Sequence, residues 1–291
     1  MPSTREIRRR IRSIRNTAQI TRAMEMVAAS RMRRAQQAVT ASRPFSEKIR
    51  HVLADLGAST GGGDSVMHPL LERRPENRVT LILMTSDRGL AGSFNTNIIR
   101  TAINFMLDRQ DQQVSVIAVG RKGRDYMVRR RRDLKAEFSN IGDLPGLDAI
   151  TPVAHMIIDE FTSGQTDAVY LAYTEYITTL NQRPTLLKIL PIEPPEVEEG
   201  RETKVPDYIF EPNPAMLLRA LLPRYVEVQL YQALLESKAS EHSARMVAMR
   251  NATDNANELV EELTLTYNKL RQANITKEII EIASGAAALE G

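Results

Sequence analysis

Cysteine and tryptophan are absent from this 291-residue chain, and aromatic residues make up only 5% of it. The absence of cysteine excludes structural disulfides, thiolate metal sites and thiol switching. This low aromatic content is more typical of long helices that pack through small residues than of an aromatic-rich β-sandwich. With 42% hydrophobic residues the chain can still build a core, and its length allows one large or two small domains.

Long apolar runs are missing as well. No stretch of about 18 apolar residues occurs, and the chain opens with charged residues instead of the apolar segment of a signal peptide. We therefore expect a protein that is soluble or is attached to a membrane only through its partners.

The net charge of +3 hides an uneven distribution. Residues 1–50 contain thirteen Lys and Arg against three Glu, a balance of +10, so the rest of the chain carries −7. A basic face concentrated on one segment predicts an acidic partner. Nucleic acid is one candidate, because basic helices contact phosphates well. A protein surface with exposed carboxylates is the other, and the lack of interleaved aromatics favours it.

The last third of the chain has the clearest periodic pattern. Asn213 is a predicted N-cap followed by Pro214, and Gly285 is a predicted stop. A continuous helix over this range would be about 100 Å long, with a kink at Pro223 only near its start. A heptad seam of mostly apolar or small residues repeats at 3,4 spacing: Leu218, Leu221, Tyr225, Val228, Gln232, Leu235, Ala239, His242, Met246, Met249, Thr253, Ala256, Val260, Leu263, Tyr267 and Leu270.

A second seam begins near the N-terminus. Ser3 and Glu6 form a predicted capping box, Glu25 interrupts the apolar register, and Pro44 is a predicted kink. Two seams at opposite ends of the chain predict an antiparallel coiled coil of the terminal helices. The N-terminal seam comprises Ile7, Ile11, Ile14, Ala18, Thr21, Glu25, Ala28, Met32, Ala35 and Val39.

Between the seams the pattern changes to alternating strands and helices. This alternation predicts an inserted, mostly parallel, Rossmann-like α/β domain. Predicted helices include residues 98–107, a segment through Tyr126, and 151–162. The predicted strands are Val79–Thr85, Val114–Val119, Leu134–Ser139, Ala168–Tyr176 and Thr185–Ile192.

The fold class is therefore α/β, a long antiparallel coiled coil with an inserted Rossmann-like domain. The first helix covers only part of the last one, which leaves about 20 C-terminal residues without a partner in the chain. Because Leu270, Ile275, Ile279 and Ile282 are apolar, we expect other chains to surround them. The predicted boundaries are 1–57 for the first coiled-coil helix, 58–78 for a flexible link, 79–192 for the α/β domain, 193–212 for a loop and 213–291 for the last helix.

No motif predicts a catalytic, cofactor or metal site. The turn 86–93 follows a strand but matches neither the phosphate-loop spacing nor the dinucleotide fingerprint, and 120–123 fails in the same way. A glycine-shaped turn is the simpler interpretation. The arginine run 129–132 is most simply a solvated helix end. The four histidines lack metal-ligand spacing, and His242 falls on the seam, where packing explains it: His51, His68, His155 and His242.

Three segments resemble signatures of the gamma-subunit family of F-type ATP synthases: 23–33 (AMEMVAASRMR), 85–92 (TSDRGLAG) and 275–288 (ITKEIIEIASGAAA). They occur in the family's order. The resemblance implies a non-catalytic rotor shaft standing in a ring of alpha and beta subunits. Its α/β domain would contact the epsilon subunit and the membrane c ring.

The resemblance also implies partner contacts at particular residues. Met24, Arg245, Arg271, Gln272, Thr276 and Glu278 correspond to contacts with the beta subunits, and Tyr208 and Glu211 correspond to the foot on the c ring. No cofactor, nucleic acid or transmembrane segment is implied. The implied location is peripheral, on the cytoplasmic face of a bacterial membrane. Two alternatives stay open from the residues alone: a basic coiled-coil nucleic-acid-binding or adaptor protein, and a nucleotide-dependent enzyme that uses the α/β domain.

Overall fold

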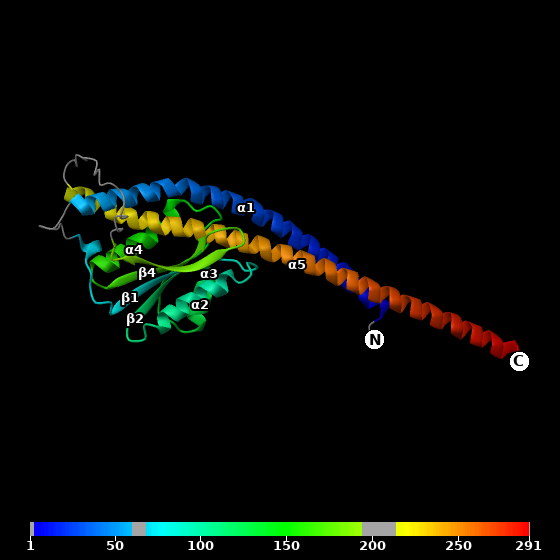
Figure 1. Cartoon of the computed structure of the whole chain (residues 1–291). Helices are drawn as coiled ribbons and strands as arrows, with labels where there is room; N and C mark the ends of the chain where they lie inside the picture. The colour runs from blue at the N-terminus through cyan, green and yellow to red at the C-terminus, as the bar shows by residue number, and fades with distance from the viewer. Residues whose placement is uncertain (1–2, 60–67, 194–213, 291) are drawn as a thin grey trace. The chain divides into compact units, whose positions relative to one another are not determined.

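The structure, a computed structural model, describes residues 3–59, 68–193 and 214–290. The chain forms two compact units. The helical unit contains Met1–Ala28 and Met246–Gly291, and the α/β unit contains Ala29–Arg245. Two long helices, α1 (Thr4–Ser59) and α5 (Pro214–Glu290), each contribute to both units (Figure 1).

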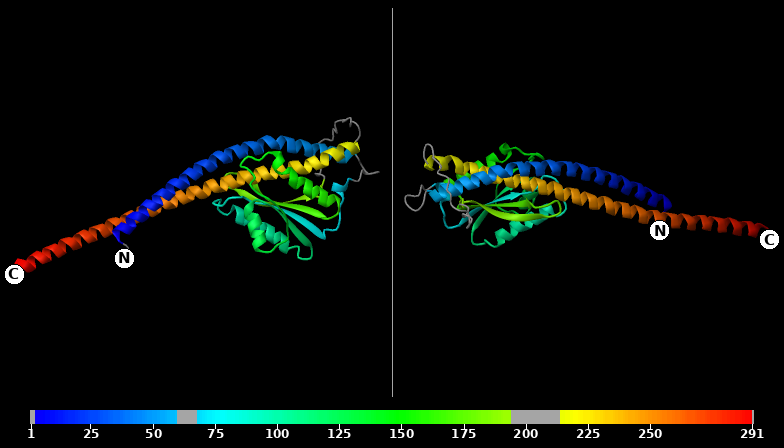
Figure 2. Two further views of the ribbon diagram at one scale, coloured as in Figure 1. Left: turned by 180° about the vertical axis from the view of Figure 1, so that it is seen from behind. Right: turned by 45° about the horizontal axis from the view of Figure 1, so that its top comes forward.

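In the helical unit, α1 and α5 lie side by side and antiparallel (Figure 2). The Thr21 and Thr253 hydroxyls are 2.7 Å apart, and Arg250 Nε is 2.9 Å from Glu25 Oε1. Arg8 donates to the Tyr267 hydroxyl further along. Glu25 thus interrupts the apolar pattern because it pairs with a cation on the facing helix. Every predicted seam position of this unit is buried or half-buried.

Beyond Leu270 the pairing ends. Every described side chain from 271 to 285 is exposed, including Ile279 and Ile282, whose side chain is 73% exposed. The unpaired C-terminal segment predicted from the helix lengths is therefore present in the structure.

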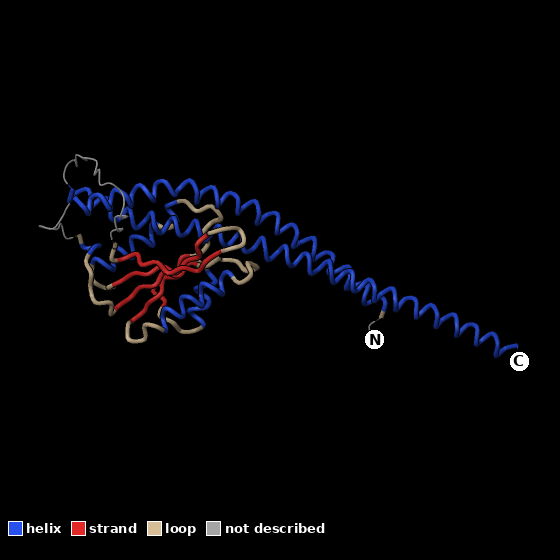
Figure 3. The backbone as a smooth tube through the Cα atoms, viewed as in Figure 1, coloured by secondary structure: helices blue, strands red, loops and turns tan. Residues whose placement is uncertain are grey.

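A five-stranded sheet forms the centre of the α/β unit (Figure 3). The strand order is β3-β2-β1-β4-β5, with β1 to β4 parallel and β5 antiparallel to β4 at one edge. This order is that of doubly wound nucleotide-binding folds, so the expected mostly parallel sheet is confirmed. The strands are β1 (Arg78–Met84), β2 (Gln113–Val119), β3 (Leu134–Phe138), β4 (Ala168–Tyr176) and β5 (Gln182–Leu190).

Helices cover both faces of this sheet. Because side chains alternate along a strand, Leu81 packs with Ile98 and Met127 on one face, whereas Ile82 packs with Leu230 on the other. The first face carries α2 and α3, and the second carries α4 and α5. The bounds are α2 (Phe94–Leu107), α3 (Arg121–Arg129) and α4 (Thr151–Thr162), with short 3-10 turns η1 (Pro69–Leu71) and η2 (Leu147–Ala149).

Helix α5 is more deeply buried in this unit than its seam predicts. Between residues 222 and 245 most of its side chains are buried, on all sides of the helix. One side packs on α1, where Ala35 and Val39 meet Leu235 and Ala239. The remaining sides face the sheet and α4. The seam therefore identified only one of the contact faces of α5.

Some sequence expectations were wrong. Helix α5 continues to Glu290, past the predicted stop at Gly285, because that glycine does not adopt the left-handed conformation of a C-cap and three alanines follow it. Helix α1 continues through Pro44, and a kink at this proline stays a prediction. Strand β5 begins earlier than predicted because it is an edge strand, where Pro184 is tolerated.

Other local expectations hold. The Ser3 hydroxyl accepts from the backbone N–H of Glu6 at 3.2 Å, which is one of the two hydrogen bonds of the predicted capping box, and Glu6 Oε1 accepts from Arg10. The predicted link 58–78 lies partly outside the described residues, at 60–67, and its described part includes η1.

The turn between β2 and α3 depends on Gly120. Its φ is +104°, and a Cβ there would lie 2.2 Å from the Thr85 carbonyl oxygen. We expect Gly120→Ala to lower the free energy of unfolding by more than about 2 kcal/mol, because both strain and overlap oppose the methyl group. Gly142→Ala is the control, since a Cβ there meets nothing within 4 Å. Urea unfolding followed by circular dichroism measures both, and equal stabilities for the two variants would contradict the interpretation.

Candidate functional site

The carboxyl ends of β1 and β4 are covered by α5. The Ser240 hydroxyl donates to the Thr174 carbonyl at 3.2 Å, and the Ser243 hydroxyl donates to that of Thr179 at 2.5 Å. Arg245 donates to the Gly89 carbonyl from Nη2 and Nε, at 3.3 and 3.4 Å. In doubly wound sheets the strand order reverses at this place, which is where nucleotides usually bind. Here α5 forms hydrogen bonds with the backbone carbonyls at that place.

The turn 86–93 is closed by hydrogen bonds within the chain. The backbone N–H of Ser86 donates to Asn95 Oδ1 at 3.0 Å. At the start of α3, the N–H of Arg121 donates to Asp87 Oδ1 at 3.0 Å, and that of Gly123 donates to Thr85 Oγ1 at 2.8 Å. Because these donors are engaged, the geometry favours a structural turn over a phosphate-binding loop.

A buried ion network lies on α5 beside this edge. Glu241 accepts from Arg245 Nη2 at 2.8 Å and lies 3.5 Å from Lys238 Nζ, which also donates to the Ile141 carbonyl at 3.2 Å. The three charged side chains are 7 to 11% exposed. One carboxylate thus serves two cations, and the carbonyls of Gly89 and Ile141 satisfy further donors. The resemblance named Arg245 as a contact with the beta subunits and not as part of this network, and nothing in the sequence singled out Lys238 or Glu241.

His242 is the most enclosed member of the cluster, with a side chain 1% exposed. Arg245 Nη1 lies 3.4 Å from His242 Nδ1, and because a guanidinium only donates, Nδ1 is the acceptor. The proton of the neutral ring then sits on Nε2, 3.7 Å from Asp143 Oδ1, where it has no hydrogen-bond partner. Asp143 in turn pairs with Arg31 of α1 at 2.9 Å. Burial lowers the pKa of His242, with a further lowering by Arg245 and Lys238 against the opposing effect of Glu241 and Asp143.

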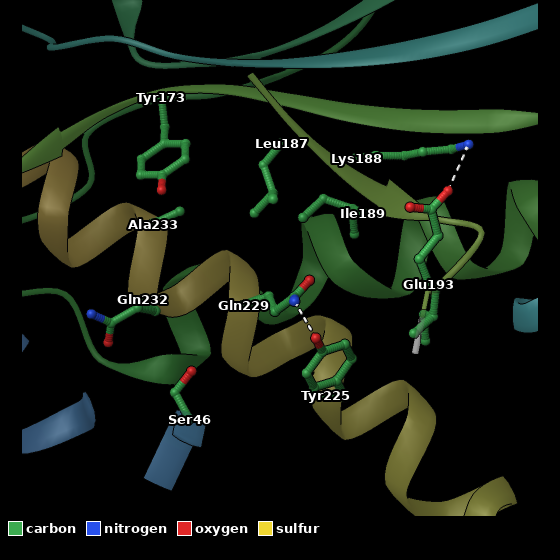
Figure 4. A pocket seen from close by; sticks show the side chains of 11 residues that line it. Ser46, Tyr173, Leu187, Lys188, Ile189, Glu193, Tyr225, Gln229, Gln232 and Ala233 are labelled. Carbon is green, nitrogen blue, oxygen red and sulfur yellow. Dashed lines mark hydrogen bonds and ion pairs between the residues drawn. The ribbon is translucent and has the colours of Figure 1, made fainter. Parts of the chain in front are cut away.

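A hollow of about 530 Å³ opens between α1, β5 and α5 (Figure 4). Its wall includes Tyr173, Leu187 and the amide of Gln229, which donates to the Tyr225 hydroxyl. Burial raises the pKa of Tyr173, and nearby carboxylates raise it further. Lys188, which also lines the hollow, pairs with Glu76 and Glu193, so its amine is held in ion pairs.

The whole chain matches known proteins of one kind. The family model described as ATP synthase matches residues 3–289. An ATP synthase gamma chain of Roseiflexus castenholzii is 58% identical over 99% of both chains, and one of Dehalococcoides mccartyi is 51% identical over 99% of this chain and all of the relative. The chain belongs to the ATP synthase gamma chain family. The nucleic-acid-binding or adaptor alternative receives no support from these comparisons.

Chains from solved ATP synthase structures share the fold. A chain of the Euglena gracilis mitochondrial ATP synthase, from a structure of OSCP, F1 and c ring, has a TM-score of 0.66 and 18% identity over 98% of this chain and 94% of that one. A chain from the Tetrahymena thermophila central stalk and c ring has a TM-score of 0.61 and 24% identity over 80% of this chain and 99% of that one. At these identities the likeness concerns the fold.

The contact residues implied for a gamma chain lie in three settings. Arg245 belongs to the buried network and is 11% exposed, whereas Met24 is half-buried on α1. The four upper-shaft residues are exposed on α5, and within the described residues their side chains have no hydrogen bond or ion pair: Arg271, Gln272, Thr276 and Glu278. Tyr208 and Glu211 lie outside the described residues.

Two kinds of feature are absent from the described ranges 3–59, 68–193 and 214–290. No cluster of three or more His, Asp or Glu side chains is placed to bind a metal there. Nor does any helix in those ranges have the length and apolar character needed to cross a membrane.

The buried network makes a stability prediction. Glu241→Gln leaves Lys238 and Arg245 without their shared countercharge, so we expect unfolding to become easier by about 3 kcal/mol or more. The matched control is Glu262→Gln, an exposed carboxylate on the same helix, which should change stability by less than about 0.5 kcal/mol. Denaturant unfolding at neutral pH measures both, and similar values would mean that the network contributes little.

His242 makes a pH prediction. Its pKa is lower in the folded chain than in the unfolded chain, so as pH falls below about 6.5 the unfolded chain takes up a proton first. Stability should therefore decrease from pH 7 toward acid, and His242→Gln should make that decrease smaller. Thermal unfolding across this pH range measures the slope. His155→Gln, at an exposed position, serves as the control, and an unchanged slope in His242→Gln would refute the assignment.

Proposed function

We propose that this chain is the non-catalytic central rotor shaft of an F-type ATP synthase, coupling ion flow through the c ring to conformational cycling of the beta subunits. The observation that carries the proposal is the C-terminal part of α5, a helix with exposed isoleucines and no packing partner among the described residues. An apolar helix of this kind requires a surrounding surface. Membership of the gamma chain family supports a ring of alpha and beta subunits as that surface.

The mechanism requires a stiff and asymmetric shaft. One helix pair inside a ring of three beta subunits presents a different face to each of them, so each is biased toward a different conformation and nucleotide affinity. Rotation then exchanges these states, giving ATP synthesis, and hydrolysis drives the reverse rotation. We assign the stiffness to an antiparallel coiled coil of α1 and α5, which the Thr21 to Thr253 and Arg250 to Glu25 contacts support.

The buried contacts of α5 in the α/β unit provide a route for torque. Ser240 binds a carbonyl near the end of β4, Ser243 binds one in the loop after it, and Arg245 binds the carbonyl of Gly89 after β1. Because the helix is fixed to two adjacent strands, it cannot turn about its axis without breaking these bonds. We therefore assign this edge the role of a clamp between the body of the rotor and its shaft.

The individual partner contacts are part of the proposal. Met24 and Arg245 are assigned to the acidic loops of the beta subunits, and Arg245 would contact them through the small part of its side chain that is exposed. The upper-shaft set Arg271, Gln272, Thr276 and Glu278 is assigned to the top of the ring, which its exposure supports.

The remaining assignments concern the membrane side. Tyr208 and Glu211 are assigned to a foot on the c ring, and the α/β domain is assigned a contact with the epsilon subunit. The domain boundaries 1–57, 58–78, 79–192, 193–212 and 213–291 belong to the same proposal. The complex would place the chain on the cytoplasmic face of a bacterial membrane as a peripheral subunit.

The exposed isoleucines test the shaft. We expect Ile275→Asn, Ile279→Asn and Ile282→Asn together to leave the stability of the isolated chain unchanged, because these side chains are exposed there. In complexes reconstituted with alpha and beta subunits, the same variant should weaken assembly at least tenfold, since each isoleucine loses about 1.5 kcal/mol or more of burial. Size-exclusion chromatography and ATPase activity provide the measurements.

A polar substitution on the same segment is the matched control. Lys277→Gln changes an exposed residue and should assemble normally. Deletion of the chain after Leu270 should reproduce the effect of the triple variant. If the triple variant assembled and coupled normally, or if the unmodified chain neither joined alpha and beta nor altered their activity, the shaft proposal would be wrong.

A further inference from the structure

Four consecutive arginines, Arg129–Arg132, form a surface that the rotor contacts leave unexplained. Arg129 ends α3, and the next three arginines with Asp133 connect it to β3. All four are exposed, and none forms an ion pair within the described residues. The one recorded side-chain contact is that of Arg130, whose guanidinium lies 5.8 Å from the centre of the Tyr126 ring. We call these four residues the arginine turn.

The backbone of the turn has a left-handed conformation at Arg131, which is unfavourable for any residue with a side chain. The N–H of Arg132 donates to the Met127 carbonyl and that of Arg131 to the Val128 carbonyl, which is the Schellman pattern of helix ends. Arg131 has a φ of +51°, at the position where glycine is preferred. A long cationic side chain therefore occupies a site where glycine would fold with less strain, and strained residues of this kind cluster at functional sites.

The arginine turn lies at the amino end of the sheet. The N–H of Val116 donates to the Asp133 carbonyl, directly after the turn, so the turn adjoins the start of β3. Strand β5 runs antiparallel and finishes at this same end, where the N–H of Ile192 donates to the Leu70 carbonyl. Leu218 at the start of α5 belongs to the same core as these residues. The turn thus lies at the amino ends of the parallel strands, whereas Gly89 and Arg245 lie at their carboxyl ends.

We propose that the arginine turn binds the phosphate groups of an anionic phospholipid membrane, an inference that rests on the proposed function. In that function, the end of the α/β unit where β5 ends and α5 begins is the membrane side. Guanidinium groups bind phosphate through paired N–H donors. Val128 beside the turn is 58% exposed and supplies an apolar side chain for the headgroup layer.

Two physical arguments favour lipid over a stationary protein and over a nucleic acid. A fixed acidic site on a non-rotating protein would attract the turn at one angle and so oppose rotation, whereas a fluid lipid layer attracts it equally at every angle. Single-stranded nucleic acid would need aromatic platforms, and the adjacent Tyr126 is only half-exposed and lies beneath Arg130.

The test compares variants in complexes with alpha and beta subunits but without the membrane sector, so that the basic α1 helix is covered. Binding is measured by sedimentation with phosphatidylcholine vesicles, with and without phosphatidylglycerol. Each arginine removed should weaken binding to the anionic vesicles about fivefold, so Arg130→Gln with Arg132→Gln should weaken it about 25-fold. The matched control, Arg88→Gln with Arg100→Gln, removes two exposed arginines elsewhere on the α/β unit and should bind normally.

A single substitution separates binding from folding. Arg131→Gly relieves the left-handed strain, so its Tm should stay unchanged or rise by about 2 °C, while its binding to anionic vesicles falls about fivefold. A purely structural role for the turn predicts normal binding in this variant.

Several outcomes would overturn the proposal. The first is normal vesicle binding by the turn variants, and the second is an equal loss of vesicle binding in the matched control. The third is a loss of binding to detergent-solubilised c ring without a loss of vesicle binding, which would identify a protein partner instead. Failure of the unmodified chain to assemble with alpha and beta would instead count against the proposed function. The paired comparison on the full chain alone would then still decide the lipid proposal.

Discussion

The burial of α5 between residues 222 and 245 is the constraint on which the α/β unit depends. A helix buried on all sides must find a partner for every polar group it carries, because an unpaired buried group costs more than a hydrogen bond contributes. Lys238, Glu241 and Arg245 meet this requirement together, and the carbonyls of Gly89 and Ile141 complete their shell. Such a network fixes the rotation of the helix, since turning it by one residue would bury these charges without partners.

The same edge of the sheet explains why a nucleotide-binding topology carries no nucleotide motif. In doubly wound folds the crevice at the strand reversal is left open for a ligand. Here Arg245 reaches the loop after β1, and Ser240 and Ser243 bind the end of β4 and the loop after it. The fold has kept the geometry of the crevice, but a helix of the same chain occupies it. Fold and function are separable in this sense.

What the sequence could predict follows from which interactions leave a periodic trace. Part of the seams was predictable because α1 and α5 contact each other at some of their positions, such as Thr21 with Thr253 and Val39 with Leu235 and Ala239. The strands were predictable because a covered parallel sheet requires continuous apolar runs. Lys238 and Glu241 look like solvent-exposed residues in sequence. Lys238 donates to the Ile141 carbonyl, 97 positions away, and Glu241 pairs with Lys238 and Arg245 at helical spacing, which is also common on exposed helix faces.

Backbone conformation at helix ends was the second feature that the sequence did not predict. Gly285 has the residue type of a helix stop, but a stop also needs the left-handed backbone and its two reversed hydrogen bonds, which sequence alone does not determine. Arg131 is the converse case, because a residue type that argues against a C-cap adopts that conformation with both hydrogen bonds formed. Among the contact residues, the resemblance named individual positions such as Met24 and Glu278, whereas periodicity alone predicted only that the final segment needs a partner.

The burial of α5 changes in three steps along its length. It is enclosed between 222 and 245, covered mainly along one face between 246 and 270, and exposed from 271 to 285. The exposed isoleucines do not stabilise the isolated helix, because their transfer from water is favourable only in contact with another apolar surface. The helix is therefore stabilised by its own chain where it is enclosed and requires a second surface where it is exposed. A single continuous helix that satisfies both conditions can transmit rotation between them, because its backbone hydrogen bonds resist twisting over the whole length.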